Sequence, residues 1–193
     1  MAVNPPVPDY ELDETVELTT AEQVRAISDP LRTTILGLLH ERAATVTELA
    51  SAVKRPKSTV AHHVNVLANA GLLRVVRTRR VRAIEERYYG RAARMFYVGL
   101  GHRADGSDLP RDFNDFEVAA KESATAYNAG ELASFIRHAR ISDERVSEFW
   151  ARIKQVVHEF DRLPRSGDTT YGFVVGVYPM PDYPVLPPAG RDD

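Results

Sequence analysis

The chain has 193 residues, of which 44% are hydrophobic and 27% are charged, and its formal net charge is −2. This size and balance predict one good-sized globular domain, or a small domain followed by an elaborated second half. There is no apolar run of about eighteen residues and no basic start before an apolar stretch, so we expect neither a membrane span nor a secretory signal. The absence of cysteine excludes disulfides, thiolate metal sites and a cysteine nucleophile, and it fits a cytoplasmic protein.

The first part of the chain predicts an acidic arm and three short helices. Residues 1–18 carry acidic side chains and no lysine or arginine. In chain order we expect a short strand near 16–18 and helices over 21–27, from Pro30 and from Thr45 or Thr47. Each helix begins behind a side chain that can accept first-turn hydrogen bonds, namely Thr19 or Thr20, Asp29 and Thr45.

A fourth helix is expected to open at Ser58, which follows Pro56 and has a side chain suited to capping. Apolar residues at helical spacing define its buried side, and they are Val60, Val64 and Leu67. The helix should end just before Gly71, because glycine readily adopts the left-handed conformation that follows many helices.

A β-ribbon is expected next, because 73–79 and 81–89 are rich in β-branched, aromatic and arginine residues with a basic tip at Arg79 and Arg80. Positive charge is concentrated in the part of the sequence that contains this ribbon. The span 54–94 holds eleven basic and two acidic residues, a net charge of +9, which leaves −11 for the rest of the chain. Such a concentration indicates a polyanionic partner, although a solvated charged face is the commoner origin of a charge run.

The second half predicts helices over 115–127 and 142–163, after a loop-like stretch at 99–114. The longer helix carries an apolar stripe at spacings of three and four, formed by Val146, Phe149, Trp150, Ile153, Val156, Val157 and Phe160. Residues 133–141 fit either a strand or a helix end. Residues 169–178 have the composition of a strand.

The fold class expected from this order is α+β, mainly α. The third and fourth helices are separated by a four-residue turn and followed by the ribbon, which is the order of a winged helix-turn-helix. We expect a helix-and-strand dimerisation or sensor region after it. The expected divisions are an acidic arm at 1–18, the DNA-binding domain at 19–97, a linker loop at 98–114, a dimerisation or effector region at 115–180 and a proline-rich tail at 181–193.

Candidate DNA contacts follow from this arrangement, because a helix fits the major groove while the turn and wing hold phosphates. The candidates for base contacts lie away from the buried side of the fourth helix and are Thr59 and His62, with Asn65 or His63 beside them. The candidates for backbone or minor-groove contacts are Lys54, Arg55, Lys57, Ser58, Arg77, Arg79, Arg80 and Arg82. The plainer interpretation of His62 and His63 is that both are ordinary surface histidines.

The stretches SDPLR at 28–32, TELA at 47–50 and STVAHHVNVLANAGL at 58–72 resemble the ArsR-like winged-helix regulators. The resemblance covers 19–97, about 40% of the chain. It implies a dimeric, cytoplasmic, bacterial regulator, often a repressor released by a small-molecule effector, with double-stranded DNA as its partner. Metal-sensing members carry a cysteine motif on the third helix, whereas 48–53 reads ELASAV here, so thiolate sensing of a metal is not expected. His158 and Asp161 lie one turn apart on the long helix and offer a nitrogen and an oxygen ligand, but two ligands are few for a metal site and a solvated helix face is favoured. We therefore expect no metal site and no cofactor.

The apolar stripe of the long helix favours a homodimer interface formed by Phe149, Trp150, Ile153 and Val157, although the same stripe suits packing on an internal core. One alternative function is a winged-helix protein-interaction module that does not bind DNA, against which the basic segment argues. Another is an enzyme. No Walker loop, nucleophile elbow or HExxH motif is present, so we expect no catalytic residues.

Overall fold

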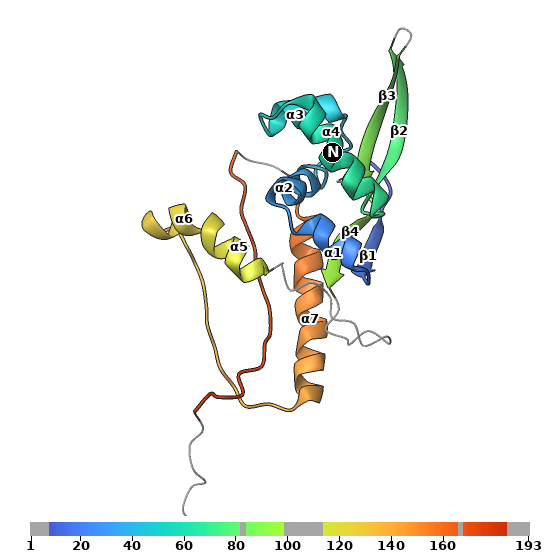
Figure 1. Ribbon diagram of the computed structural model, residues 1–193. Helices are drawn as coiled ribbons and strands as arrows, with labels where there is room; N and C mark the ends of the chain where they lie inside the picture. The colour runs from blue at the N-terminus through green and yellow to red at the C-terminus, as the bar shows by residue number, and fades with distance from the viewer. Residues whose placement is uncertain (1–7, 82–83, 99–113, 166–167, 185–193) are drawn as a thin grey trace, which may run out of the picture.

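The structure is a computed structural model that describes residues 8–81, 84–98, 114–165 and 168–184 (Figure 1). Its elements in chain order are β1 (Asp13–Leu18), α1 (Ala21–Ile27), α2 (Pro30–Leu38), α3 (Val46–Ala52), α4 (Lys57–Asn69), β2 (Leu73–Val81), β3 (Ile84–Arg91), β4 (Ala93–Val98), α5 (Asp115–Glu122), α6 (Ala124–Asn128) and α7 (Asp143–Arg162). The predicted fold class is confirmed, because the chain is α+β and mostly helical, with a helix-turn-helix that leads into a wing. No helix in the described residues is long and apolar enough to cross a membrane.

The first three helices begin where their cap residues predict. Thr20 caps α1 and forms a capping box with Gln23. The Asp29 carboxylate accepts hydrogen bonds from the next two N–H groups of α2 at 2.9 and 3.0 Å. Thr45 caps α3 and forms a capping box with Glu48. Each such cap contributes about 1 kcal/mol, so these boundaries are determined by local sequence.

The predicted start of the fourth helix is wrong by one residue. α4 begins at Lys57 behind Pro56, no side chain caps it, and Ser58 lies inside its first turn. The Pro56 carbonyl accepts the first helical hydrogen bond, from the Val60 N–H at 3.1 Å. The fixed φ of proline therefore sets the start of the helix in place of a serine cap. The end is as predicted, with Gly71 at a φ of 73°.

One apolar core joins the helices to the base of the wing. The predicted buried side of α4 is confirmed, because all three of its apolar residues are fully buried. The largest fully buried side chains are Leu18, Ile35, Leu39, Leu49, Leu67, Leu72, Val24, Val60 and Val64. Burying one such side chain contributes about 1.5–3 kcal/mol, so this core supplies a rigid base for α4 and the wing.

Two small sheets complete the domain. β2 and β3 pair antiparallel to form the wing, and β1 pairs parallel with β4. The strand expected near 16–18 is therefore present, although it starts at Asp13. The expected basic tip is displaced, because Arg79 and Arg80 lie within β2, which continues to Val81.

Tyr10 attaches the acidic arm to the base of the wing. Its hydroxyl donates a hydrogen bond to the Leu39 carbonyl and accepts one from the Arg91 N–H at 2.9 Å. Its ring lies against Gly90, where a Cβ atom would come within 2.6 Å of ring atom Cε2. The absence of a side chain at Gly90 therefore allows the close approach of the arm.

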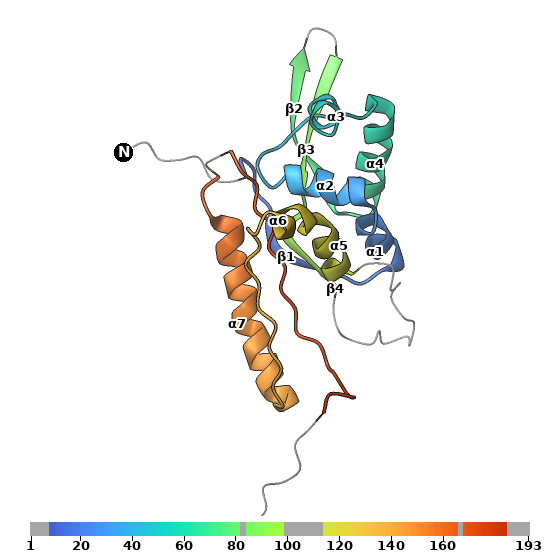
Figure 2. The ribbon, with the colours of Figure 1, turned by 90° about the vertical axis from the view of Figure 1, so that its left-hand side faces the viewer.

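The carboxy-terminal half is an open arrangement of helices and extended segments. α7 begins behind Ser142 as predicted, whereas the helix expected over 115–127 is divided into α5 and α6. Residues 133–141 are neither strand nor helix. Figure 2 shows α7 to one side of α1–α4, with two extended segments running lengthwise beside it.

The prediction of a strand at 169–178 is wrong for the single chain. The segment is extended, but it pairs with no strand among the described residues. A β-strand forms only with a hydrogen-bonded neighbour, and composition alone does not provide one. The segment is held by side chains, with the Phe173 ring centroid 5.1 Å from that of Phe160 in α7.

Glu14 of β1 connects the two halves of the chain. Its carboxylate lies 2.7 Å from Arg162 and 3.6 Å from His158, both in α7, and 3.9 Å from Arg94 in β4. The hydrogen bond from Arg162 is the main cause that lowers the pKa of Glu14. This cluster links β1 and β4 to α7. Because the carboxylate is more than half exposed, the ion pairs add little to the free energy of unfolding.

His40 at the end of α2 predicts a pH dependence of stability. Burial, together with the charges of Arg91, Arg165 and Arg94, lowers the pKa of His40 from 6.5 to about 3. As the pH falls through this window, the unfolded chain binds a proton that the folded chain does not, so folding stability is lost. We expect the melting temperature of the wild type to fall further between pH 7 and pH 4 than that of His40→Gln, measured by circular dichroism. Equal decreases would contradict this assignment.

Candidate nucleic-acid interface

The turn between α3 and α4 presents basic side chains at the amino end of α4. Lys54 and Arg55 are exposed, and the exposed Lys57 opens the helix beside them. Lys54 adopts a left-handed φ of 52°, a conformation that costs a residue with a side chain roughly 1–2 kcal/mol. The Arg55 N–H donates to the Ala50 carbonyl at 3.1 Å, which closes the end of α3. The turn therefore gathers three of the predicted phosphate-contacting residues.

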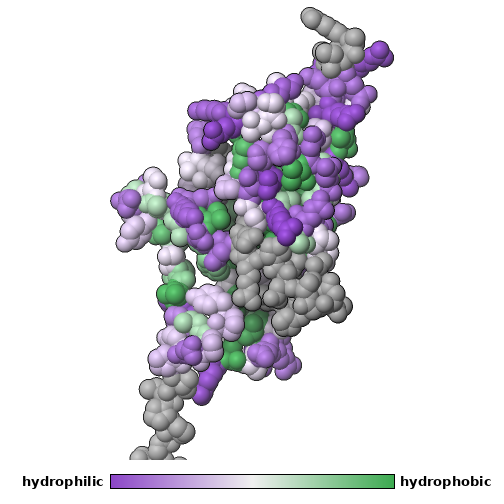
Figure 3. Space-filling view, in the orientation of Figure 1, coloured by the Kyte–Doolittle hydropathy of each residue, from purple (hydrophilic) through white to green (hydrophobic). Residues whose placement is uncertain are grey.

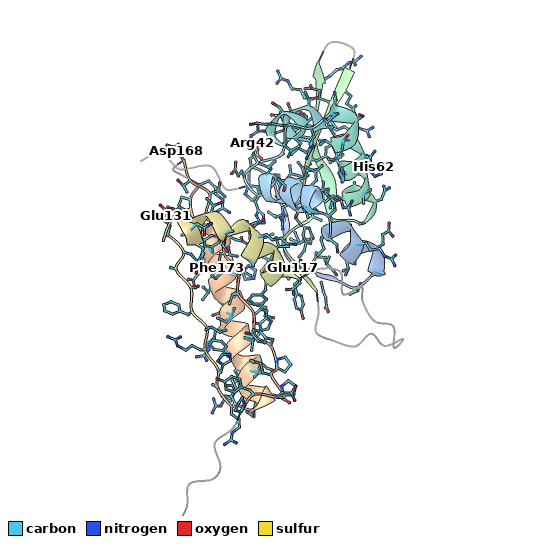
Figure 4. All side chains as sticks on the ribbon, turned by 60° about the vertical axis from the view of Figure 1, so that its left-hand side comes forward. Arg42, His62, Glu117, Glu131, Asp168 and Phe173 are labelled. Carbon is cyan, nitrogen blue, oxygen red and sulfur yellow. The ribbon has the colours of Figure 1, made fainter. Side chains whose placement is uncertain are left out.

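α4 has an exposed side opposite its buried one. Four of the predicted DNA-contacting residues are exposed on it, namely Ser58, Thr59, His62 and Asn65. Figure 4 shows His62 on the side of the domain away from the half that contains Glu131 and Phe173. Among the described residues, no side chain caps the first-turn N–H groups of α4, and such groups attract anions. The helix therefore presents hydrogen-bonding side chains and a positive end together.

His63 lies in a different environment from His62. Its side chain is 15% exposed, and its Nδ1 atom lies 3.6 Å from the Asp29 carboxylate at the start of α2. It borders an open cleft of about 640 Å³ that Thr59 and Arg55 also line. His63 thus faces α2 beside the predicted contact surface, and its contact with DNA stays a prediction.

The wing carries the remaining predicted contacts. Arg77, Arg79 and Arg80 are exposed on β2, whereas Arg82 lies outside the described residues. In the β2–β3 register Arg79 is opposite Glu86 and Arg80 is opposite Glu85. The two acidic residues of the basic segment therefore lie across from these two arginines and reduce the positive charge of the wing.

Arg91 at the end of β3 is buried, which the sequence analysis missed. Its guanidinium donates to the carbonyls of Ala93 at 3.0 Å, Leu36 at 3.1 Å and Arg94 at 2.8 Å, and it lies 4.8 Å from the centre of the Phe96 ring. Burial lowers the pKa of Arg91 to about 10, so it stays charged at neutral pH. It belongs to the core, and the net charge of +9 overstates the charge available to a partner.

Arg77 is already engaged by the arm. Its guanidinium lies 3.3 Å from the Asp9 carboxylate and 4.5 Å from the centre of the Tyr88 ring. The other oxygen of Asp9 accepts a hydrogen bond from the Ala43 N–H at 2.7 Å. No local pattern joins residues 68 positions apart in the sequence, so this contact was not predicted.

This contact predicts that the arm competes with DNA for Arg77. Asp9→Asn removes the charge and keeps an oxygen for the Ala43 N–H, so we expect affinity for any duplex to rise about two- to fivefold. The slope of log affinity against log salt concentration should become steeper by up to about 1. Fluorescence anisotropy across a salt series measures both quantities. Glu11→Gln is the matched control, because it removes the same charge and Glu11 meets Arg74 through its backbone carbonyl. An equal rise in that control would contradict a specific competition.

The predicted dimer-interface residues lie along α7. Phe149 is 43% exposed, and Trp150, Ile153 and Val157 are half-buried. No residue of α7 is fully buried, so the described part of the chain covers its apolar stripe only in part. Figure 3 shows hydrophilic side chains around the wing and hydrophobic ones recurring over the carboxy-terminal half.

Residues 27–76 match the family model of a helix-turn-helix domain. An uncharacterized HTH-type transcriptional regulator of Methanocaldococcus jannaschii is 38% identical over 55 residues, which cover 28% of this chain and 62% of that protein. The chain thus spans less than two thirds of the length of this relative.

One solved structure with similarity to the chain is a crystal structure of a possible transcriptional regulatory protein (fragment 1–100) from Mycobacterium bovis. It is 26% identical, the match covers 38% of this chain and 73% of that chain, and the TM-score is 0.32. A solution structure from Mycobacterium bovis, a homodimeric winged helix-turn-helix DNA-binding domain of a possible ArsR-family regulator, has 20% identity, 62% and 86% coverage, and a TM-score of 0.34. Scores this low do not establish a shared overall architecture. The family match at 27–76 and the order α3, α4, β2 both indicate a helix-turn-helix in the part of the chain described above. The chain therefore contains a helix-turn-helix domain, and over that part it is similar to an HTH-type transcriptional regulator.

Proposed function

We propose that the chain is a sequence-specific DNA-binding transcription regulator that acts as a homodimer and represses its target promoter. The observation that carries the proposal is the two-sidedness of α4. Its apolar side is fully buried, while polar side chains and the basic turn occupy the exposed side. A rigidly packed helix with hydrogen-bonding residues near its amino end suits base readout in the major groove.

Each part of the domain has a distinct role in this proposal. Thr59 and His62 read base edges, and the turn with Lys54 and Arg55 holds phosphates. The wing, through Arg79 and Arg80, lies on the backbone or in the minor groove. Phosphate contacts supply most of the affinity and its salt dependence, while base contacts supply the sequence preference.

A homodimer is proposed because one helix reads too few base pairs for specificity. Two copies related by a two-fold axis address half-sites about 34 Å apart, one turn of DNA. The partly exposed stripe of α7, with Phe149 and Trp150 as anchors, supports dimerisation through the carboxy-terminal half. The family resemblance also implies that a small-molecule effector releases the repressor from DNA, and we include this in the proposal.

His62→Ala tests base readout directly. We expect discrimination between the native upstream duplex and a scrambled duplex to fall by about 1–3 kcal/mol, with a much smaller loss on the scrambled one. Competition anisotropy with both duplexes measures this difference. Asn69→Ala, at the other end of the same helix, is the control and should leave discrimination unchanged. An equal loss on both duplexes would place His62 at a phosphate and contradict its role in readout.

A further inference from the structure

The carboxy-terminal half exposes apolar side chains throughout. No residue in the described segments 114–165 and 168–184 is buried. Of the exposed large hydrophobic side chains in the described residues, all but Val75 lie in these segments, with Phe135 at 89% and Tyr171 at 76% exposure. Apolar surface exposed to water on this scale indicates an interaction site that a binding partner covers.

Residues 169–178 form one extended segment of this half whose backbone has no hydrogen-bonded partner among the described residues. The sequence TTYGFVVGVY has strong β-propensity, and no backbone hydrogen bond joins it to other described residues. An extended apolar segment with unpaired N–H and C=O groups is a template for another strand.

The chain holds this segment in place by its side chains. Phe173 packs on Phe160 of α7, and Figure 4 shows it beside that helix. At Gly176 the Phe116 ring comes so close that a Cβ would lie 2.7 Å from it. The Phe116 ring also meets Tyr178 edge-on, with centroids 6.0 Å apart. These contacts hold the segment and leave its backbone without a hydrogen-bonded partner in the described part of the chain.

A second copy of the chain suits this segment better than another partner. The segment contains no charged residue, so two identical copies can lie side by side without the repulsion that like charges would cause. It is also continuous, through Phe160, with the α7 stripe already proposed as the dimer seam. A two-fold axis that pairs two α7 helices brings the two segments close to each other.

We propose that residues 169–178 form an antiparallel β-pair with the same residues of a second copy, across the two-fold axis of the dimer. This inference rests on the proposed homodimer and adds the strand pairing to it. The paired backbones satisfy each other's N–H and C=O groups, and the rows of Tyr, Phe and Val side chains cover each other. The strand that composition predicts thus forms between chains.

The absence of cysteine allows a direct test by single substitutions. Cysteine is introduced in turn at five positions, namely Tyr171, Phe173, Val174, Val175 and Val177, and each full-length variant is oxidised. We expect one position, or two adjacent ones, to form an interchain disulfide at least about tenfold faster than Ser51→Cys on exposed α3. The crosslinking rate should fall at positions before and after this one, because each residue further from the two-fold axis adds about 7 Å to the distance between the two cysteines.

A backbone substitution provides a second, independent readout. Val174→Pro removes an N–H and should weaken the dimer about tenfold or more relative to Val174→Thr, as measured by sedimentation equilibrium. A dimer in which no position crosslinks faster than Ser51→Cys would overturn the strand pairing while leaving the homodimer and DNA binding intact. A monomer at all concentrations would overturn the homodimer itself, and with it this pairing.

Discussion

Replacing Arg79 and Arg80 together by alanine is expected to weaken binding to every DNA duplex, with little change in sequence preference. Both side chains are exposed on β2, and neither forms an ion pair within the described residues. If each neutralises one phosphate, the slope of log affinity against log salt falls by about 2 in magnitude. Loss of two charge-assisted contacts lowers affinity by about tenfold or more at moderate salt.

The matched control for this double substitution is Arg137→Ala with Arg140→Ala. Both residues are exposed in the carboxy-terminal half, so the control removes the same charge away from the wing. Anisotropy across a salt series with native and scrambled duplexes measures affinity and slope for both pairs. If the wing variant keeps its affinity and slope, or the control loses as much, the wing does not contact DNA.

Substitution of the buried Arg91 is expected to cause the largest loss of stability. Arg91→Met keeps the apolar stem and removes the donors to the carbonyls of Leu36, Ala93 and Arg94. Buried carbonyls without a partner cost about 1–3 kcal/mol each, so we expect a loss of about 3–5 kcal/mol. The change should appear as a lower urea midpoint, followed by far-ultraviolet circular dichroism.

Two controls separate this role from a general charge effect. Arg87→Met removes an exposed charge from the same strand and should leave the midpoint nearly unchanged. Arg91→Lys keeps the charge but cannot reach three carbonyls from one point, so its midpoint should lie between those of the wild type and Arg91→Met. A wild-type midpoint in Arg91→Met would show that the guanidinium is not needed for the fold.

The features predicted correctly from sequence are those that neighbouring residues determine. The caps at Thr20, Asp29 and Thr45 act within one helical turn, so the starts of α1, α2 and α3 were predictable. The buried side of α4 follows from its 3.6-residue period, and Gly71 marks its end.

The features that were missed depend on contacts between distant residues. β1 pairs with β4, some eighty positions away, and neither sequence indicates the other. Arg91 is an arginine of the basic segment like the exposed Arg87 of the same strand, yet it lies against the carbonyl of Leu36 and the ring of Phe96. The strand at 169–178 was wrong for the single chain, because β-propensity describes a surface that fits a neighbour and does not supply one.

Sequence-specific DNA binding is tested by measuring binding of the purified full chain to duplex DNA by fluorescence anisotropy across a salt series. One duplex carries the region upstream of its own gene, and the other has the same composition in scrambled order. We expect tight binding to the native duplex, a steep salt dependence and a clear preference over the scrambled duplex. Absence of binding to either duplex at low salt would contradict this expectation and would favour a winged-helix module that contacts proteins.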